Sequence, residues 1–195
     1  MKMDNNNTPS AVKQKLQTRT RRSQGTSIAE LAGILLVLFI FFAFPLMNLC
    51  ALGLRSSLLI SSAKEASIRA SKSLTYSVAP SGVAGNNVPA IQVAQETVKA
   101  YLANFNGVKA TSVQVGIVTV NNSNGTKSGP VYSALPTTDT TFGNTYYLDV
   151  VVTGQAEPLA SYSGGMLGSI PGLTSPIQLV CHGQRVFENP KGLTL

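Results

Sequence analysis

The chain has 195 residues, of which 44% are hydrophobic and 12% are charged, and its formal net charge at pH 7 is +7. The first 25 residues hold six bases and one acid, a net of +5, so the rest of the chain, with nine bases and seven acids, carries only +2. Because the excess charge is confined to one end, it argues against a nucleic-acid-binding domain, and two cysteines are too few for a disulfide scaffold.

A run of 24 residues without a charged side chain, Leu31–Leu54, follows the basic segment. As an α-helix it would extend about 36 Å, which exceeds the roughly 30 Å hydrocarbon core of a bilayer. Fifteen of these residues are Leu, Ile, Val or Phe, and together they favour insertion by about 4 to 9 kcal/mol, offset in part by Pro45 and Asn48. We therefore predict a single membrane-spanning helix in contact with the lipid bilayer. The bases before it favour a cytoplasmic N-terminus and export of the chain after Arg55.

The segment before the span fits a prepilin-type leader better than other export signals. A secretory signal has a shorter apolar stretch, of about 7–15 residues. A lipoprotein signal has a small residue before its cysteine, whereas Leu49 precedes Cys50, and the polar residues after Arg21-Arg22 disfavour a twin-arginine signal. A prepilin leader is cut on the cytoplasmic side, here after Gly25, and the apolar helix stays attached.

Cleavage after Gly25 would supply a partner for Glu30. The new α-amine, on Thr26, would be mostly cationic at neutral pH. Glu30 lies one helical turn onward at the edge of the span, where an unpaired carboxylate is costly. The same region also forms a capping box, with Ser27 as N-cap and Glu30 at the third helical position, and an uncleaved signal anchor would gain about 1 kcal/mol from it. The two roles are compatible, and we predict Gly25 and Thr26 as the processing site and Glu30 as the assembly residue.

The helix is predicted to continue beyond the membrane as a stem. Residues 55–74 contain no Pro or Gly, and small or apolar residues recur there at helical spacing: Leu59, Ala63, Ala66 and Ala70. We expect a cytoplasmic leader at residues 1–25, a transmembrane half of the stem at 26–54 and an amphipathic half at 55–75. The high serine content leaves a short linker as the alternative for the last part. Pro45 lacks a backbone donor and is predicted to kink or loosen the helix.

Residues 76–195 are predicted to form an exported α+β domain. Loop composition is followed by a second helix over roughly Ala90–Asn106, ended by Gly107. Alternating residues then predict strands around Val113–Ile117, Tyr147–Thr153 and Ile177–Phe187, with a strong turn signal at Asn121–Gly125. The expected fold class is membrane-anchored α+β: a long stem helix and a second helix packed on a small antiparallel sheet of three or four strands.

No catalytic, metal or cofactor site is predicted. Cys50 lies in the span and Cys181 in a strand, so they are not expected to pair; Cys181 is expected to be a buried strand residue, with an intersubunit disulfide as the alternative. His182 alternates to the opposite face from Cys181, which disfavours a Cys–His site. The acids Asp139, Asp149, Glu157 and Glu188 show no spacing that indicates catalysis. We expect a protein that is not an enzyme and that binds neither nucleic acid nor a small-molecule substrate.

The stretch from Arg22 to Lys72 resembles the N-terminal region of TadE-like minor pseudopilins from tight-adherence (Flp, type IVc) pilus systems. The matching features are Arg-x-x-Gly at Arg22–Gly25, the tripeptide Glu30-Leu31-Ala32, the aliphatic and aromatic span, and a Ser/Ala-rich helix. Arg185-Val186-Phe187-Glu188 is weakly similar to the ending of such proteins.

The resemblance implies that Gly25 precedes the cut, that Thr26 is the new N-terminus and that Glu30 is the assembly acid. It further implies a structural subunit of the bacterial inner membrane or pilus, with a prepilin peptidase and other pilin or pseudopilin subunits as partners and a role in secretion or cell adhesion. Leu31 stands where major Flp pilins usually carry an aromatic residue, which favours a minor subunit. The alternative is an unprocessed, signal-anchored envelope protein whose exported domain binds another partner.

Overall fold

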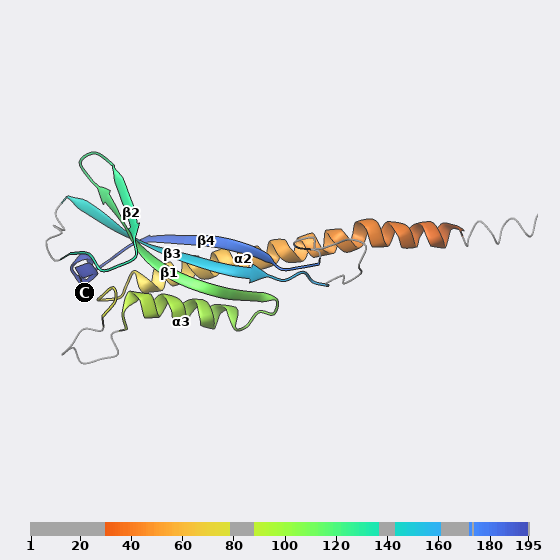
Figure 1. Cartoon of the computed structure of the whole chain (residues 1–195), viewed down its shortest axis with the longest axis horizontal. Helices are drawn as coiled ribbons and strands as arrows, with labels where there is room; N and C mark the ends of the chain where they lie inside the picture. The colour runs from red at the N-terminus through yellow and green to blue at the C-terminus, as the bar shows by residue number, and fades with distance from the viewer. Residues whose placement is uncertain (1–29, 79–87, 137–142, 161–171, 173, 195) are drawn as a thin grey trace, which may run out of the picture. The chain divides into compact units, whose positions relative to one another are not determined.

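The computed structural model describes residues 30–78, 88–136, 143–160, 172 and 174–194 (Figure 1). The chain divides between Met47 and Asn48 into two compact units. In the described part of the first unit the backbone is helical from Glu30 onward, and the side chains of residues 31–42 are all exposed. Among the described residues one helix, Glu30–Ala70, is long and apolar enough to cross a membrane by length and composition.

The helix departs from α geometry directly before Pro45. A π-helical turn, η1 (Phe39–Ala43), is followed by α2 (Phe44–Ala70), and the Phe44 N–H donates to the Phe39 carbonyl, five residues back. Pro45 has no N–H to offer the carbonyl of Phe41, and its ring crowds that carbonyl in a regular α-helix. The wider π turn is a known way for a helix to absorb such a local conflict. The kink predicted at Pro45 stays a prediction.

The second unit contains a four-stranded sheet in the order β2-β1-β3-β4, with every neighbouring pair antiparallel. The strands are β1 (Val108–Asn121), β2 (Lys127–Val131), β3 (Asn144–Ala156) and β4 (Ile177–Val186). The predicted α+β class with an antiparallel sheet is confirmed.

The turn predicted between the first two strands is also present. The Gly125 N–H donates to the Asn121 carbonyl at 2.8 Å, and Gly125 has a φ of +69°, which a residue with a side chain rarely adopts. β2 pairs only with the C-terminal half of β1, from Ile117 to Val120. The outer edge of β1 before Ile117 therefore has no partner strand among the described residues.

Both helices of the second unit cover the same face of the sheet. The predicted stripe of α2, Leu59, Ala63, Ala66 and Ala70, is wholly buried, and α3 (Ala90–Leu102) packs beside β1 (Figure 1). The two helices and the alternate strand residues form one core, whose strand members include Ile117, Leu148, Val150 and Val152. The stem predicted after the apolar run is thus a helix docked on the sheet and not a linker.

The second helix ends earlier than the predicted Asn106. The Ala103 N–H still donates to the Lys99 carbonyl, but Phe105 N–H donates to Leu102, three residues back, as the helix tightens and ends. Val108 must already pair with Ala156 in the sheet, so the chain has to turn before that residue. Gly107, with a φ of +80°, serves this turn into β1 and is not the residue that follows the helix.

A short 3₁₀ helix, η2 (Pro190–Thr194), lies against the segment that follows α2. The Tyr76 N–H donates to the Gly192 carbonyl at 2.9 Å, and a Cβ at Gly192 would collide with the backbone of Leu74. Leu193 is buried in the core. These contacts fix the end of the stem to the last described part of the chain.

Candidate functional site

The structure describes the predicted assembly acid but not the predicted processing residues. Gly25 and Thr26 lie outside the described residues. Glu30 is the first residue described, it is helical and exposed, and within the described chain no cation forms an ion pair with it. Pro45 is half-buried, next to the π turn. The structure therefore presents Glu30 at the start of an exposed apolar helix.

Among the described residues, nothing covers most of the apolar side chains in the first half of the helix. The large side chains from Leu31 to Met47 that are aliphatic or aromatic are mostly 50–70% exposed, for example Phe41 at 68% and Phe42 at 71%. A soluble core helix would bury such residues, and an exposed apolar surface of this extent indicates a membrane or protein contact. This segment is the largest candidate interaction surface in the described chain.

Packing against the domain begins at Asn48, inside the predicted transmembrane half. The Asn48 side chain is 1% exposed, and its amide makes two bonds to Ala160: Nδ2 donates to the carbonyl oxygen at 3.2 Å, and Oδ1 accepts from the N–H at 3.2 Å. One turn later Leu52 is 6% exposed, and next Arg55 donates from Nη1 to the Glu157 carbonyl. Residues 48–55 thus dock one helix face on the end of β3 and the chain after it.

The stem and the sheet approach each other at glycines. A Cβ added to Gly183 in β4 would lie 2.5 Å from the carbonyl carbon of Ala63 and 2.9 Å from the nitrogen of Lys64. At Gly154 in β3 it would lie 2.6 Å from a methyl carbon of Leu59. Small residues on the helix and glycines on the strands therefore let the backbones come close together.

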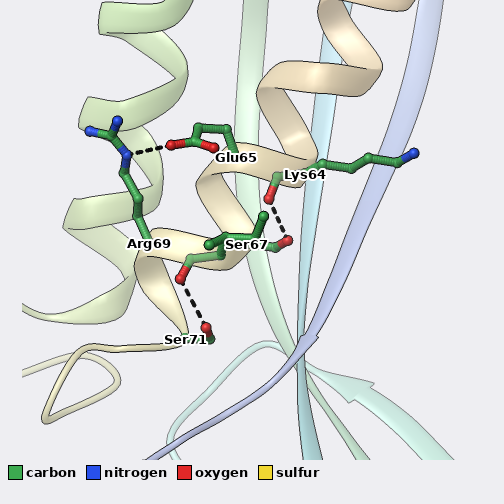
Figure 2. A network of polar contacts seen from close by, with 6 residues as sticks. Lys64, Glu65, Ser67, Arg69 and Ser71 are labelled. Carbon is green, nitrogen blue, oxygen red and sulfur yellow. Dashed lines mark hydrogen bonds and ion pairs between the residues drawn. The ribbon is translucent and has the colours of Figure 1, made fainter.

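The buried serines of the stem make their side-chain hydrogen bonds within the helix. Ser62, Ser67 and Ser71 are buried, and their hydroxyls donate to carbonyls three residues back at 2.8–3.0 Å. Figure 2 shows Ser67 bonded to the backbone of Lys64, and the exposed pair Arg69–Glu65, whose Nε and Oε1 are 2.7 Å apart. Because the buried hydroxyls have partners, they do not require a ligand.

A groove of about 600 Å³ lies between α3 and the unpaired half of β1. Its apolar lining includes Val98, Leu102 and Phe105, and Lys99 and Lys109 stand beside it. Lys109 also contacts Glu157, with 3.2 Å between Nζ and Oε1. The groove is open and partly basic, so it is suited to a segment of a partner chain more than to a small enclosed ligand.

The face of the sheet away from the helices carries one buried acid. Asp149 is 2% exposed, and its Oδ2 lies 3.2 Å from Nδ1 of His182, which is itself largely exposed. Cys181 points to the opposite face, where burial raises the pKa of its thiol, so it is a buried strand residue, as predicted. Within the described chain no three His, Cys, Asp or Glu residues form a cluster suited to a metal ion.

Two of these arrangements were not predicted from the sequence. The Asp149–His182 pair joins neighbouring strands on one face, and strand alternation combined with the right register would have found it. The bonds between Asn48 and Ala160 join positions 112 residues apart, and an Asn inside an apolar run was the only local signal.

Comparisons of this chain with protein-family models, with curated proteins and with solved structures give no match.

Proposed function

We propose that this chain is a membrane-held structural subunit, a minor pseudopilin of a bacterial tight-adherence type pilus or a related secretion system, processed after Gly25. In this proposal the helix from Leu31 is inserted in the inner membrane, the leader is cytoplasmic and the α+β domain is exported. The subunit acts by assembly and not by catalysis.

The observation that carries the proposal is the division of one helix into two kinds of surface. From Leu31 to Met47 the helix exposes most of its apolar side chains, and from Asn48 to Ala70 it buries one face on an antiparallel sheet. A subunit that is first stored in a membrane and then packed by its helices needs both surfaces. The position of Glu30 at the start of the described helix, directly before the apolar run, supports the predicted pairing with a new N-terminus, because a carboxylate beside hydrocarbon requires a cation.

The first test is the intact mass of the chain purified from membranes of its native cells. Loss of residues 1–25 is expected, with Thr26 as the first residue. Gly25→Ala should slow the cut and accumulate the uncut chain. Gly33→Ala is the matched control, because a Cβ at Gly33 meets no atom within 4 Å and this change should leave processing unaltered. A full-length wild-type chain in cells that cut other prepilins would overturn the proposal.

The second test concerns Glu30. Glu30→Gln removes the charge but keeps the shape, so insertion and cutting should persist while incorporation into the assembly falls. Glu65→Gln is the control, since Glu65 is a partly exposed acid on the same helix, and in the described part of the chain its ion pair is with Arg69. Normal assembly of the Glu30 variant, measured by the subunit content of sheared surface fractions and membrane complexes, would remove the pairing role.

The groove beside α3 favours a second candidate, an uncut signal-anchored protein whose exported domain binds a partner chain. The same mass measurement separates the two, since this candidate retains Met1. Charge reversal at Lys99 and Lys109 should then abolish capture of the partner, whereas a pseudopilin held by its stem would still assemble.

A further inference from the structure

The two faces of the helix have different surroundings at the level where it meets the domain. On one face Asn48 and Leu52 are buried by the chain after β3 and by Gly172. On the other face, at the same level, Leu49 is 64% exposed and Leu54 is 69% exposed. Nothing in the described chain covers this second face.

The rise per residue of the helix indicates where Asn48 would lie relative to the hydrocarbon core of a bilayer. A hydrocarbon core of about 30 Å takes up about 20 helical residues at 1.5 Å each. If it starts at Leu31, immediately after the charged Glu30, it reaches Cys50, two residues beyond Asn48. A tilted helix would carry the core further along the chain. With the helix inserted as in the proposed function, Asn48 and the backbone bonded to it would lie at the outer boundary of the hydrocarbon.

The polar groups around Asn48 are hydrogen-bonded, as a position near hydrocarbon requires. An Asn amide and a backbone N–H and carbonyl are costly near hydrocarbon unless they are paired. Here Asn48 and Ala160 satisfy each other with two bonds. Two turns further along the helix, Arg55 donates to the Glu157 carbonyl, and Lys109 pairs with the Glu157 side chain, as expected for cations at the headgroup level.

The chain bonded to Asn48 also carries an exposed apolar side chain. Leu159 is 55% exposed, directly before Ala160 and two residues after Glu157. The next residue, Ala160, is bonded to Asn48, which directly precedes the uncovered Leu49 in the helix. An apolar side chain held by a hydrogen-bonded backbone at this depth matches the chemistry of the bilayer interface, where apolar groups enter about 5–10 Å below the headgroups.

We propose that the segment Pro158–Ala160 is a second membrane contact of the exported domain, held by Asn48 in the outer interfacial layer, with Leu159 among the lipid chains. This inference rests on the membrane insertion in the proposed function. It places the domain on the bilayer surface and assigns the lipid as the partner that covers Leu49, Leu54 and Leu159.

The absence of tryptophan from the chain gives a direct test by depth-dependent quenching. Three single-tryptophan variants of the full chain are placed in phosphatidylcholine nanodiscs that contain lipid with a nitroxide at carbon 5 or carbon 12 of one chain. Leu159→Trp reports the proposed contact, and Phe41→Trp reports the span. Tyr132→Trp, at an exposed position directly after β2, reports the part of the sheet in which β2 pairs with β1, which Figure 1 shows away from the end of β3.

Emission of Leu159→Trp should fall about twofold with the carbon-5 label, while Tyr132→Trp should be nearly unaffected, because interfacial side chains lie near the upper chain carbons. Phe41→Trp should respond most to the carbon-12 label. If Phe41→Trp is quenched and Leu159→Trp behaves like Tyr132→Trp, the second contact is wrong and the anchoring stands. If Phe41→Trp is not quenched, the membrane insertion itself fails and the inference fails with it.

A second variant tests whether the bonds from Asn48 keep Pro158–Ala160 at the membrane. In the Leu159→Trp chain, Asn48→Ala removes both bonds to Ala160, and quenching of the tryptophan introduced at position 159 should fall to the level of Tyr132→Trp. The response of Phe41→Trp in the same background should not change. Unchanged quenching at position 159 would overturn the assignment of this hold to Asn48.

Discussion

Replacing Gly183 by alanine tests the close packing of the stem on the sheet. The new Cβ would lie 2.5 Å from the carbonyl carbon of Ala63, whereas carbon atoms normally rest about 3.5–4.0 Å apart. The clash is with backbone, so no rotamer change relieves it, and the helix and strand must separate by about 1 Å. The contact therefore predicts a loss of stability although alanine is usually better than glycine within a strand.

The size of the loss follows from two opposing effects. Overpacking of a core typically costs about 1–3 kcal/mol. Replacing glycine by alanine inside a strand otherwise gains roughly 0.5–1 kcal/mol. Since the clash here is severe, we expect a net loss of about 2 kcal/mol, out of a total of about 5–15 kcal/mol for a typical domain.

The assay is urea unfolding of the full chain in detergent micelles, followed by near-ultraviolet circular dichroism of the tyrosines. The midpoint should fall by about 1 M, because slopes of about 1–3 kcal/mol/M are typical. Gln184→Ala, the exposed neighbour on the other face, should change stability by less than about 0.5 kcal/mol. An unchanged midpoint for Gly183→Ala would refute the packing argument.

A double substitution distinguishes backbone from side-chain contact. Ala63→Gly should not rescue Gly183→Ala, because the obstructing atoms belong to the main chain. At Gly154 the nearest obstruction is the end of the Leu59 side chain, so Leu59→Val should recover part of the loss caused by Gly154→Ala. Equal rescue at both glycines would contradict this distinction.

Three further predictions concern single side chains. The Tyr76 hydroxyl donates to the Val115 carbonyl at 2.6 Å, so Tyr76→Phe should cost about 1–2 kcal/mol in the same urea assay, and full stability of this variant would contradict a role for the bond. Burial, with a smaller contribution from Tyr132, raises the pKa of Tyr76 from 10.0 to about 12. Because the folded chain holds this proton more tightly than the unfolded chain, the protonated hydroxyl contributes to stability below pH 10, and this contribution should be lost as the pH rises from 10 to 12. Tyr76→Phe should show no such loss from this position. Gly125→Ala should cost about 1 kcal/mol through its positive φ alone, since a Cβ there meets no atom within 4 Å, and a neutral result would mean that the turn relaxes.

The parts of the fold that follow from periodicity were accessible from the sequence. The stripe of Leu59, Ala63, Ala66 and Ala70 is wholly buried as predicted, and the antiparallel sheet and its first turn are present. These features depend on neighbours within a few residues, so a local pattern contains the information. The high serine content of residues 55–75 left a linker as the alternative, and the bond from Ser67 to the Lys64 carbonyl shows how a serine is accommodated in a helix.

The features that depend on distant partners were not accessible. A glycine in a strand indicates close approach of something, but nothing near Gly183 in the sequence names Ala63 as the neighbour. The partner of Asn48 is likewise remote, so its amide was counted only as a cost of insertion. The end of α3 was predicted too late because the pairing of Val108 with β3, and not helix propensity, decides where the chain turns.

The backbone contact between α2 and β4 has a mechanical consequence. No flexible side chain separates Ala63 from Gly183, so a tensile load on the helix would pass to β4 without first stretching a soft layer. From β4 the load would pass to β3 through the ladder of ten paired residues that joins the two strands. Under traction the stem and the sheet should therefore yield as a single body.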